Sequence, residues 1–376
     1  MMDQQTLGAV ALSAIASAVF LAASPANAAA APAPASTPAP APVRHPQEEA
    51  IERGPKPYTN HDVSFENPAA HIKLGGTFSV PEGKGPFAAV LLIAASGPEG
   101  RDEEAEGHHV FVVLADYLLK RGIAVLRYDK RGVGTSAGDL EKATFDDLVA
   151  DAAAAFHYLK GRAEVDHRRL GVIGHSEGGS IAPAVAASDQ DVSFVVAMAG
   201  SGLSGEVRIC EQQAYLAKEF RKASTEQQAN IKSLCHNIFA TVAQTPDDAQ
   251  AGKRIDELMS KAKADDEIKK TLTPQFVRQE LTDDPVQYVK RIHVPMLALV
   301  GTLDTIVPPE PYVAVMKPAL ASIPGSRVDV LRGLNHVMQT AQTGSPEEFG
   351  TIEETISPTA LKAIGDWIKA TAKPIS

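Results

Sequence analysis

Short apolar runs alternate with helical patterns along most of this 376-residue chain. The apolar runs are Ala88–Ala95, Ile123–Tyr128, Leu170–Ile173, Phe194–Ala199, Met296–Val300 and Val328–Leu331. The helical patterns are His108–Lys120, Phe145–Lys160, Gly178–Ala187 and Ser357–Thr371. Nearly continuous apolar runs of this length are typical of parallel strands, because helices bury both faces of such a sheet. The alternation therefore predicts an α/β fold with a doubly wound, mostly parallel sheet.

Two other segments complete the predicted organisation of the folded part. Asp62–Glu66 and Ile72–Val80 carry strand signals and predict an antiparallel pair before the parallel strands. Residues 203–290 break the alternation, since they are charged and Gln-rich with apolar residues at helical intervals. We interpret them as a helical cap insertion that divides the core into residues 58–202 and 291–376 and lies over the carboxyl ends of the strands. The alternative is a helical appendage without a role at the site.

The N-terminal segment has the pattern of an export signal. Leu7–Ala23 is an apolar run, and Ala26-Asn27-Ala28 follows it as an A-x-A cleavage pattern, so residues 1–28 are predicted to be a signal peptide. The residues before the run carry no Lys or Arg, which departs from the usual pattern and leaves an uncleaved membrane anchor as the alternative. Residues 29–57 are rich in Ala and Pro and are predicted to be a tether. We therefore expect an exported protein, periplasmic or secreted, with no stable membrane span in the mature chain.

Charge and cysteine content narrow the classes of partner. The chain is 44% apolar and 22% charged with a formal net charge of −10, which argues against nucleic acid or an anionic membrane surface as the main partner. Its two cysteines, Cys210 and Cys235, both lie in the predicted cap, where they form either one disulfide or two buried thiols. Neither cysteine belongs to a C-x-x-C pair, so the sequence does not indicate that either of them binds a metal ion.

The most informative motif is Gly174-His175-Ser176-Glu177-Gly178, which follows a predicted strand and opens a small-residue helix. A serine nucleophile in an α/β sheet occupies such a strand-to-helix turn, where its hydroxyl projects above the sheet. The backbone N–H after the nucleophile, that of Glu177, is expected to stabilise an oxyanion. The second donor is expected from the loop after Ala88–Ala95, with the N–H of Ser96 preferred and that of Gly97 as the alternative.

A serine nucleophile needs a base and an orienting carboxylate, which in this fold follow it in the order acid, then histidine. Asp304 comes just after the predicted strand Met296–Val300, and His336 comes after the last predicted strand. We therefore predict Ser176, Asp304 and His336 as the catalytic residues. The competing carboxylates are Asp329, inside a strand, and Asp129, in a glycine-containing loop.

The segment around Asp129 reads Tyr128-Asp-Lys-Arg-Gly-Val-Gly-Thr-Ser136. It lacks the G-K-[ST] of a phosphate-binding loop, so Asp129 and Arg131 are interpreted as structural residues that hold the loop by ion pairing. Arg101 and Asp102, after the predicted oxyanion loop, are interpreted as a pair that braces that loop.

Taken together, these residues resemble the α/β-hydrolase superfamily, and in particular bacterial esterases, from about Asp62 to Lys369. The matching motifs are Ala95-Ser96-Gly97-Pro98 with Arg101-Asp102, Tyr128–Ser136, Gly174–Gly178, Gly301-x-x-Asp304 and Asn335-His336. Ala95 departs from the family pattern, since many members have glycine there. The resemblance implies hydrolysis of a small-molecule carboxylic ester without a metal or organic cofactor. Peptidase, thioesterase and acyltransferase activities share the same chemistry, and a non-catalytic binding protein is a further alternative. Oligomeric state is not indicated.

Overall fold

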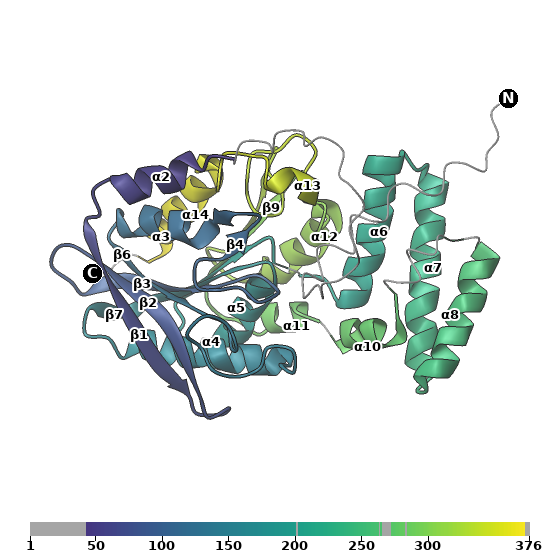
Figure 1. Cartoon of the computed structure of the whole chain (residues 1–376), viewed down its shortest axis with the longest axis horizontal. Helices are drawn as coiled ribbons and strands as arrows, with labels where there is room; N and C mark the ends of the chain where they lie inside the picture. The colour runs from purple at the N-terminus through teal and green to yellow at the C-terminus, as the bar shows by residue number, and fades with distance from the viewer. Residues whose placement is uncertain (1–42, 201, 263, 265–271, 283, 373–376) are drawn as a thin grey trace, which may run out of the picture.

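The computed structural model describes residues 43–200, 202–262, 264, 272–282 and 284–372 (Figure 1). Its main feature is an eight-stranded sheet in the order β1-β2-β6-β3-β7-β8-β9-β10. These strands are β1 (Tyr58–Asn67), β2 (Ile72–Pro81), β3 (Phe87–Ile93), β6 (Ile123–Tyr128), β7 (Val165–His175), β8 (Phe194–Met198), β9 (Met296–Gly301) and β10 (Arg327–Leu331). The strands from β6 to β10 along the sheet are parallel, whereas β2 pairs antiparallel with both β1 and β6. The predicted mostly parallel sheet with its antiparallel N-terminal pair is confirmed.

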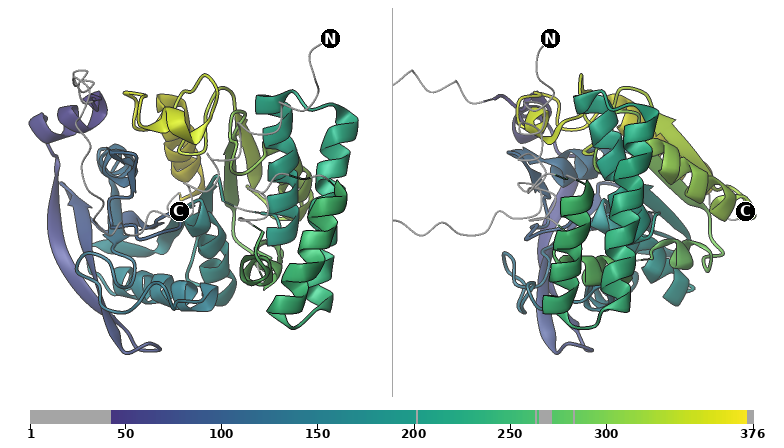
Figure 2. Two further views of the ribbon diagram at one scale, coloured as in Figure 1. Left: turned by 45° about the vertical axis from the view of Figure 1, so that its right-hand side comes forward. Right: turned by 90° about the vertical axis from the view of Figure 1, so that its right-hand side faces the viewer.

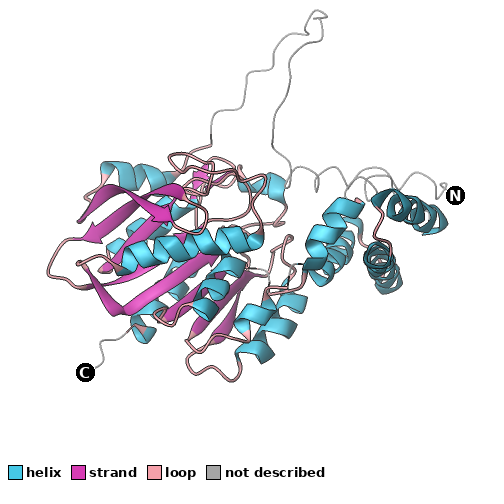
Figure 3. Cartoon of the chain, turned by 90° about the horizontal axis from the view of Figure 1, so that it is seen from below, coloured by secondary structure: helices cyan, strands magenta, loops and turns pink. Residues whose placement is uncertain are grey.

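Helices cover both faces of this sheet (Figure 3). They are α3 (Val110–Leu119), α4 (Phe145–Lys160), α5 (Glu177–Ser188), α12 (Pro309–Leu320) and α14 (Pro358–Thr371), and the short α13 (Pro346–Phe349) precedes α14. On one face, α4, α5 and α12 bury apolar side chains against residues such as Leu91 and Val172. On the other face, α3 and α14 pack against the alternate strand residues, such as Leu92 and Ile173. Two apolar cores on opposite faces define the doubly wound arrangement that the sequence predicts.

A helical insertion between β8 and β9 interrupts the alternation of strands and helices. It contains α6 (Gly205–Arg221), α7 (Thr225–Gln244), α8 (Asp248–Ala262), α10 (Pro274–Thr282) and α11 (Val286–Val289). Figure 2 shows α6, α7 and α8 side by side next to the sheet. These helices have an apolar core of their own, which includes Ile238, Phe239 and Val242. Cys210 of α6 and Cys235 of α7 form a disulfide within that core. Of the two alternatives that the sequence leaves open, one disulfide or two buried thiols, the structure has the disulfide.

Local signals at the helix ends explain where several helices begin. Thr144 precedes α4 and accepts a hydrogen bond from the N–H of Asp147, whose carboxylate accepts in return from the N–H of Thr144. Ser224 and Gln227 form the same reciprocal pair at the start of α7. Each pair satisfies backbone N–H groups that a helix leaves without partners. These pairs fix the starts of a helix of the core and a helix of the insertion.

The N-terminal part of the described chain corrects one prediction. Residues 46–53, inside the predicted tether of residues 29–57, form helix α2 (Pro46–Arg53), which packs near α3 (Figure 1). The tether prediction is therefore wrong for this part. Proline at the first helical position, acidic residues in the first turn and Arg53 in the last turn favour a helix here. The predicted signal peptide, residues 1–28, lies outside the described residues.

A short hairpin between β3 and α3 was not predicted. Its strands β4 (Glu104–Ala105) and β5 (His108–His109) pair antiparallel, so helix α3 begins at Val110 rather than at His108. Among the described residues, no helix has both the length and the apolar character needed to cross a membrane.

Candidate active site

Ser176 lies on the sharp turn between β7 and α5. Its backbone has φ 52° and ψ −116°, in the left-handed half of conformational space that residues with a side chain rarely adopt. Its N–H donates to the carbonyl oxygen of Met198 at 2.9 Å, which ties the turn to the end of the neighbouring strand β8. A strained serine at a strand-to-helix turn is the arrangement known as a nucleophile elbow.

Two glycines make this turn sterically possible. A side-chain Cβ on Gly174 would lie 1.8 Å from the carbonyl oxygen of Gly178. A Cβ on Gly178 would lie 2.0 Å from the carbonyl oxygen of Ile93, the last residue of β3. Both distances are shorter than any real Cβ contact, so the G-x-S-x-G spacing is required by the close approach of backbone segments. The loop that leaves β3 is thereby placed directly against the elbow.

The structure brings the three predicted catalytic side chains into contact. His336 Nε2 lies 2.9 Å from Ser176 Oγ, and His336 Nδ1 lies 2.9 Å from Asp304 Oδ2 and 3.1 Å from Asp304 Oδ1. Asp304 follows β9, and His336 follows β10, as predicted. Both are buried, while Ser176 is half-buried. In this geometry His336 can accept the hydroxyl proton of Ser176 through Nε2 while its Nδ1–H donates to the carboxylate.

Backbone donors hold the Asp304 carboxylate in place. Its Oδ1 accepts hydrogen bonds from the N–H groups of Ile306 at 2.9 Å and Val307 at 2.7 Å. The competing carboxylates are engaged elsewhere, since Asp329 pairs with Arg327 and Asp129 pairs with Arg101. Asp304 is therefore the carboxylate that the fold supplies to His336.

The predicted oxyanion donors lie at the two segments that meet behind Ser176. Glu177 is the first residue of α5, and its carboxylate accepts a hydrogen bond from Lys130 Nζ at 2.6 Å, so its backbone N–H, and not its side chain, is the candidate donor. Ser96 lies in the loop that leaves β3. The N–H of the preceding residue, Ala95, donates to Glu103 Oε1 at 3.0 Å and is therefore engaged. The N–H of Ser96 therefore stays the candidate second donor, with that of Gly97 as the alternative.

A buried ion pair that sequence reasoning missed lies behind the elbow. His175 Nδ1 and Glu103 Oε1 are 2.6 Å apart, and both side chains are 2% exposed. His175 Nε2 lies 3.0 Å from the carbonyl oxygen of His336, so both ring nitrogens face acceptors, and a protonated His175 donates on both sides. Burial disfavours that charged form, but the Glu103 carboxylate outweighs it and raises the pKa of His175 above its usual value. Glu103 thus connects the loop at Ala95, the elbow and the His336 loop.

The charge on Glu103 also acts on a neighbouring carboxyl. Burial and the Glu103 carboxylate raise the pKa of Glu99 to about 7. No sequence motif marks Glu103, because it acts through contacts formed only in the fold. The one sequence feature that pointed to such a contact was the histidine at position 175, between Gly174 and the nucleophile.

We predict that Glu103→Gln lowers the pKa of His175 and lowers kcat about tenfold with little change in KM, because the neutral imidazole then donates to one partner only. The raised pKa means that protonated His175 stabilises the folded state. This contribution to the free energy of unfolding is complete below about pH 6.5, the usual His pKa, and is lost as the pH rises through the pKa of His175 in the folded protein. The variant should lack this alkaline loss of unfolding free energy. An NMR titration of His175 and urea unfolding at several pH values would measure both effects. Glu104→Gln, at an exposed neighbouring position, is the control, and an unchanged His175 pKa in Glu103→Gln would contradict the assignment.

The loop after β6 is held by ion pairs, as predicted. Asp129 accepts from Arg101 and Thr135, and these hydrogen bonds outweigh burial and lower the pKa of Asp129 to about 2. Arg131 binds Asp151 at 2.6 Å. The predicted pairing of Arg101 with Asp102 is wrong, because Asp102 binds Arg127 of β6 instead.

Comparison with known proteins places this site in a family. Residues 105–340 match the Hydrolase_4 family, described as serine aminopeptidase, S33. The esterase EstD of Thermotoga maritima is 27% identical over 288 residues, which cover 76% of this chain and 63% of EstD. The chain thus aligns with less than two thirds of that relative's length.

Solved structures show the same fold at low sequence identity. The Pyrococcus furiosus esterase Pf2001 superposes with a TM-score of 0.53 at 18% identity, covering 84% of this chain and 92% of that one. Est1E of Butyrivibrio proteoclasticus, solved with ferulic acid bound, gives a TM-score of 0.51 at 16% identity, covering 82% of this chain and 98% of that one. With the family match over residues 105–340 and the sheet described above, the chain is an α/β hydrolase that belongs to the Hydrolase_4 (serine aminopeptidase, S33) family.

Proposed function

We propose that this α/β hydrolase cleaves carboxylic esters through an acyl-enzyme intermediate, with Ser176 as nucleophile, His336 as base and Asp304 as the orienting acid. The observation that carries the proposal is the continuous contact from Ser176 Oγ through His336 to Asp304, with distances of 2.9 Å on both sides of the imidazole. The similarity to the esterase EstD supports an ester as the substrate.

In the proposed reaction, Ser176 Oγ attacks the ester carbonyl carbon while His336 Nε2 takes the hydroxyl proton. The backbone N–H groups of Glu177 and Ser96 stabilise the negative oxygen of the tetrahedral intermediate, and the dipole of α5 favours the same charge. The carbon–oxygen bond to the alcohol then breaks, and His336 returns the proton to the leaving oxygen. Water, deprotonated by His336, then attacks the carbonyl carbon of the acyl-enzyme. The bond between that carbon and Ser176 Oγ breaks, His336 returns the proton to Oγ, and the acid is released. Asp304 stabilises the imidazolium in both steps.

We propose that the helical insertion acts as a cap over this site. It connects β8 to β9, and both of these strands end beside the elbow or the acid loop. Gln212 of α6 donates to the carbonyl oxygen of Ile306 at 3.0 Å, in the same loop whose N–H groups bind Asp304. Burial raises the pKa of Tyr215, also on α6, to about 12, so its phenol stays neutral. A cap in contact with the acid loop is suited to select the acyl or alcohol part of the substrate.

We propose that the protein is exported. The apolar run and A-x-A pattern of residues 1–28 motivate the proposal. The disulfide between Cys210 and Cys235 supports it, because such bonds persist in oxidising compartments outside the cytosol. N-terminal sequencing of the protein recovered from the periplasm or medium tests it, with Ala29 expected as the first residue. Recovery of the full-length chain from the cytosol alone would contradict it.

Substrate class is tested with a panel of p-nitrophenyl esters, aminoacyl anilides and acyl thioesters at equal concentration. We expect the highest kcat/KM for esters. The second candidate is a serine peptidase, which the S33 aminopeptidase description of the family favours; a clear preference for anilides would overturn the ester proposal in its favour. A preference for thioesters would overturn the ester proposal in favour of a thioesterase. An absence of turnover with reactive esters would favour a non-catalytic binding protein.

A further inference from the structure

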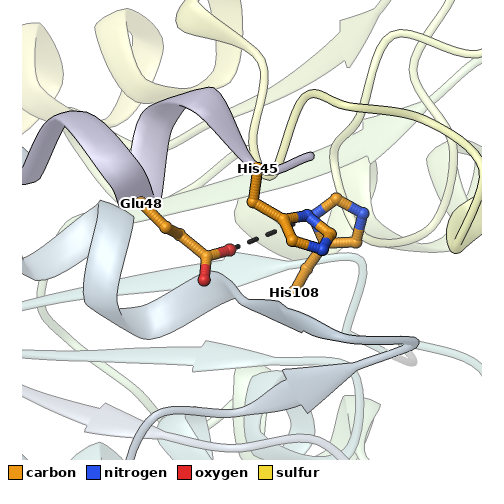
Figure 4. Close-up of side chains that lie close together, drawn as sticks. All are labelled: His45, Glu48 and His108. Carbon is orange, nitrogen blue, oxygen red and sulfur yellow. Dashed lines mark hydrogen bonds and ion pairs between the residues drawn. The ribbon is translucent and has the colours of Figure 1, made fainter. Parts of the chain in front are cut away.

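We propose that His45, Glu48 and His108 bind one divalent transition-metal ion, for which Zn²⁺ is the best chemical match, at the contact between helix α2 and the β4–β5 hairpin. Figure 4 shows His45 and Glu48, both from the start of α2, lying close to His108 of β5. One ligand atom from each lies within 4.8 Å of the other two. Two imidazoles and a carboxylate are a ligand set that suits zinc.

The fold positions the ligands independently of the active site. His45 immediately precedes α2, and Glu48 lies in the first turn of that helix, so a spacing of three residues puts both on one side of it. His108 begins β5. Gln47 donates to the carbonyl oxygen of Ile356 and accepts from the N–H of Thr355, which holds α2 against the C-terminal part of the chain. The ligands are thus carried by elements that are already anchored.

The hydrogen bonds of His108 leave one ring nitrogen available for a metal. Its Nε2 lies 3.2 Å from the carbonyl oxygen of Phe349, which can only accept, so Nε2 carries the hydrogen. Nδ1 then has the free electron pair, and it faces His45 and Thr355. A histidine that donates its other N–H to a backbone carbonyl is the usual arrangement around a bound metal.

The distances are close to those of a metal site. His45 Nδ1 and His108 Nδ1 are 3.0 Å apart, whereas two nitrogens bound tetrahedrally at about 2.0–2.1 Å from zinc lie roughly 3.3 Å apart. Without an ion, this contact needs a hydrogen on His45 Nδ1, and metal binding would move that hydrogen to Nε2. Glu48 Oε1 is 4.0 Å from His108 Nδ1, so the carboxylate must approach by a small side-chain rotation. In doing so, Oε1 exchanges its hydrogen bonds from the Thr355 hydroxyl at 2.7 Å and from the N–H of His109 at 3.0 Å for a bond to the metal.

The surroundings favour a cation and leave it accessible. His45 and Glu48 line a surface hollow of about 550 Å³, whose other charged side chains are Glu49, Glu52, Asp102 and Arg44, besides His109. Arg44 and Glu49 neutralise each other in a 2.8 Å ion pair, and Asp102 is paired with Arg127, so Glu52 supplies the remaining negative charge of the hollow beside Glu48. His109 Nδ1 lies 2.8 Å from Glu48 Oε2 and orients the carboxylate. Three protein ligands leave a fourth position for water on the side of the hollow. The ion would fasten α2 to the hairpin that follows Glu103, and it takes no part in the ester chemistry.

The test uses the full purified chain after treatment with EDTA and exchange into chelator-free buffer. Calorimetric titration with Zn²⁺ should show one site, and Co²⁺ should give the visible absorption of a tetrahedral complex. The melting temperature should rise with zinc concentration, because the ion binds the folded chain. His45→Ala and Glu48→Gln should weaken zinc binding by about 100-fold or more, since loss of a ligand exceeds the loss typical for outer partners. His61→Ala, which removes an exposed imidazole on β1, should bind zinc as the wild type does.

His108→Ala serves as a second ligand variant, and its circular dichroism spectrum shows whether it folds. Wild-type protein that binds no zinc, or His45→Ala and Glu48→Gln variants that bind it as tightly as the wild type, would overturn the proposal. These measurements report the metal directly, so their outcome is independent of the esterase assignment.

Discussion

Replacing Ser176 with alanine is expected to lower kcat for ester hydrolysis by about 10⁶-fold while KM changes little. The hydroxyl oxygen is the only heavy atom removed, and it is the atom that lies 2.9 Å from His336 Nε2. Residual rate enhancement should remain, because the substitution leaves the proposed backbone donors of Glu177 and Ser96 in place. Steady-state kinetics with a p-nitrophenyl ester would measure the loss.

A matched serine on the same helix controls for non-specific effects. Ser188, at the end of α5, donates its hydroxyl to the carbonyl oxygens of Ala184 and Val185, 3.1 and 2.9 Å away. Ser188→Ala should therefore keep near wild-type kcat. If Ser176→Ala retained more than a few per cent of wild-type activity, Ser176 would not be the nucleophile.

The second large effect is expected from Asp304→Asn, which should lower kcat about 10⁴-fold. In the native site, Oδ1 accepts from the N–H groups of Ile306 and Val307, and Oδ2 accepts from His336. An asparagine that keeps the two backbone bonds through its oxygen presents its NH₂ group to His336 Nδ1. The imidazole hydrogen must then move to Nε2, which donates to Ser176 instead of accepting its proton. Kinetics over a range of pH would measure the loss.

Asp329→Asn is the control for this substitution. Asp329 is the carboxylate that competes with Asp304 in the sequence, and it lies on β10 in an ion pair with Arg327. Its substitution should leave kcat within about twofold of wild type, because surface ion pairs contribute little. Equal losses in the two variants, or activity retained in Asp304→Asn, would remove the basis for choosing Asp304 as the acid.

The sequence was sufficient to predict the positions of the three catalytic candidates. Each follows a segment that its apolar residues predict to be a strand, and the carboxyl ends of parallel strands lie at one edge of the sheet. Ser176, Asp304 and His336 therefore had to lie near one another once the sheet order was known. The long helix Phe145–Lys160 and the strand Ile123–Tyr128 were predicted with their observed bounds, because the periodicity of their apolar residues and the residues at their ends indicate the same limits.

Interactions between segments distant in sequence were not predictable in the same way. Glu103 and His175 are 72 residues apart, and nothing in the local pattern of either indicates that they pair. Helix α2 was hidden in an Ala/Pro-rich segment, since its stability depends on contacts such as that of Gln47 with Ile356, 309 residues away. Arg101 was assigned to its neighbour Asp102, whereas the fold offers it Asp129. The candidate metal ligands were also not predictable from local sequence, because His45 and His108 are 63 residues apart.

The most direct test of the central claim is labelling of the purified protein with a fluorophosphonate probe, with wild type and Ser176→Ala side by side, followed by mass spectrometry of the labelled peptide. Our account predicts one adduct in the wild type, located on Ser176, and none in Ser176→Ala. Labelling of both proteins, or an adduct on another serine, would contradict the assignment of Ser176 as an activated nucleophile.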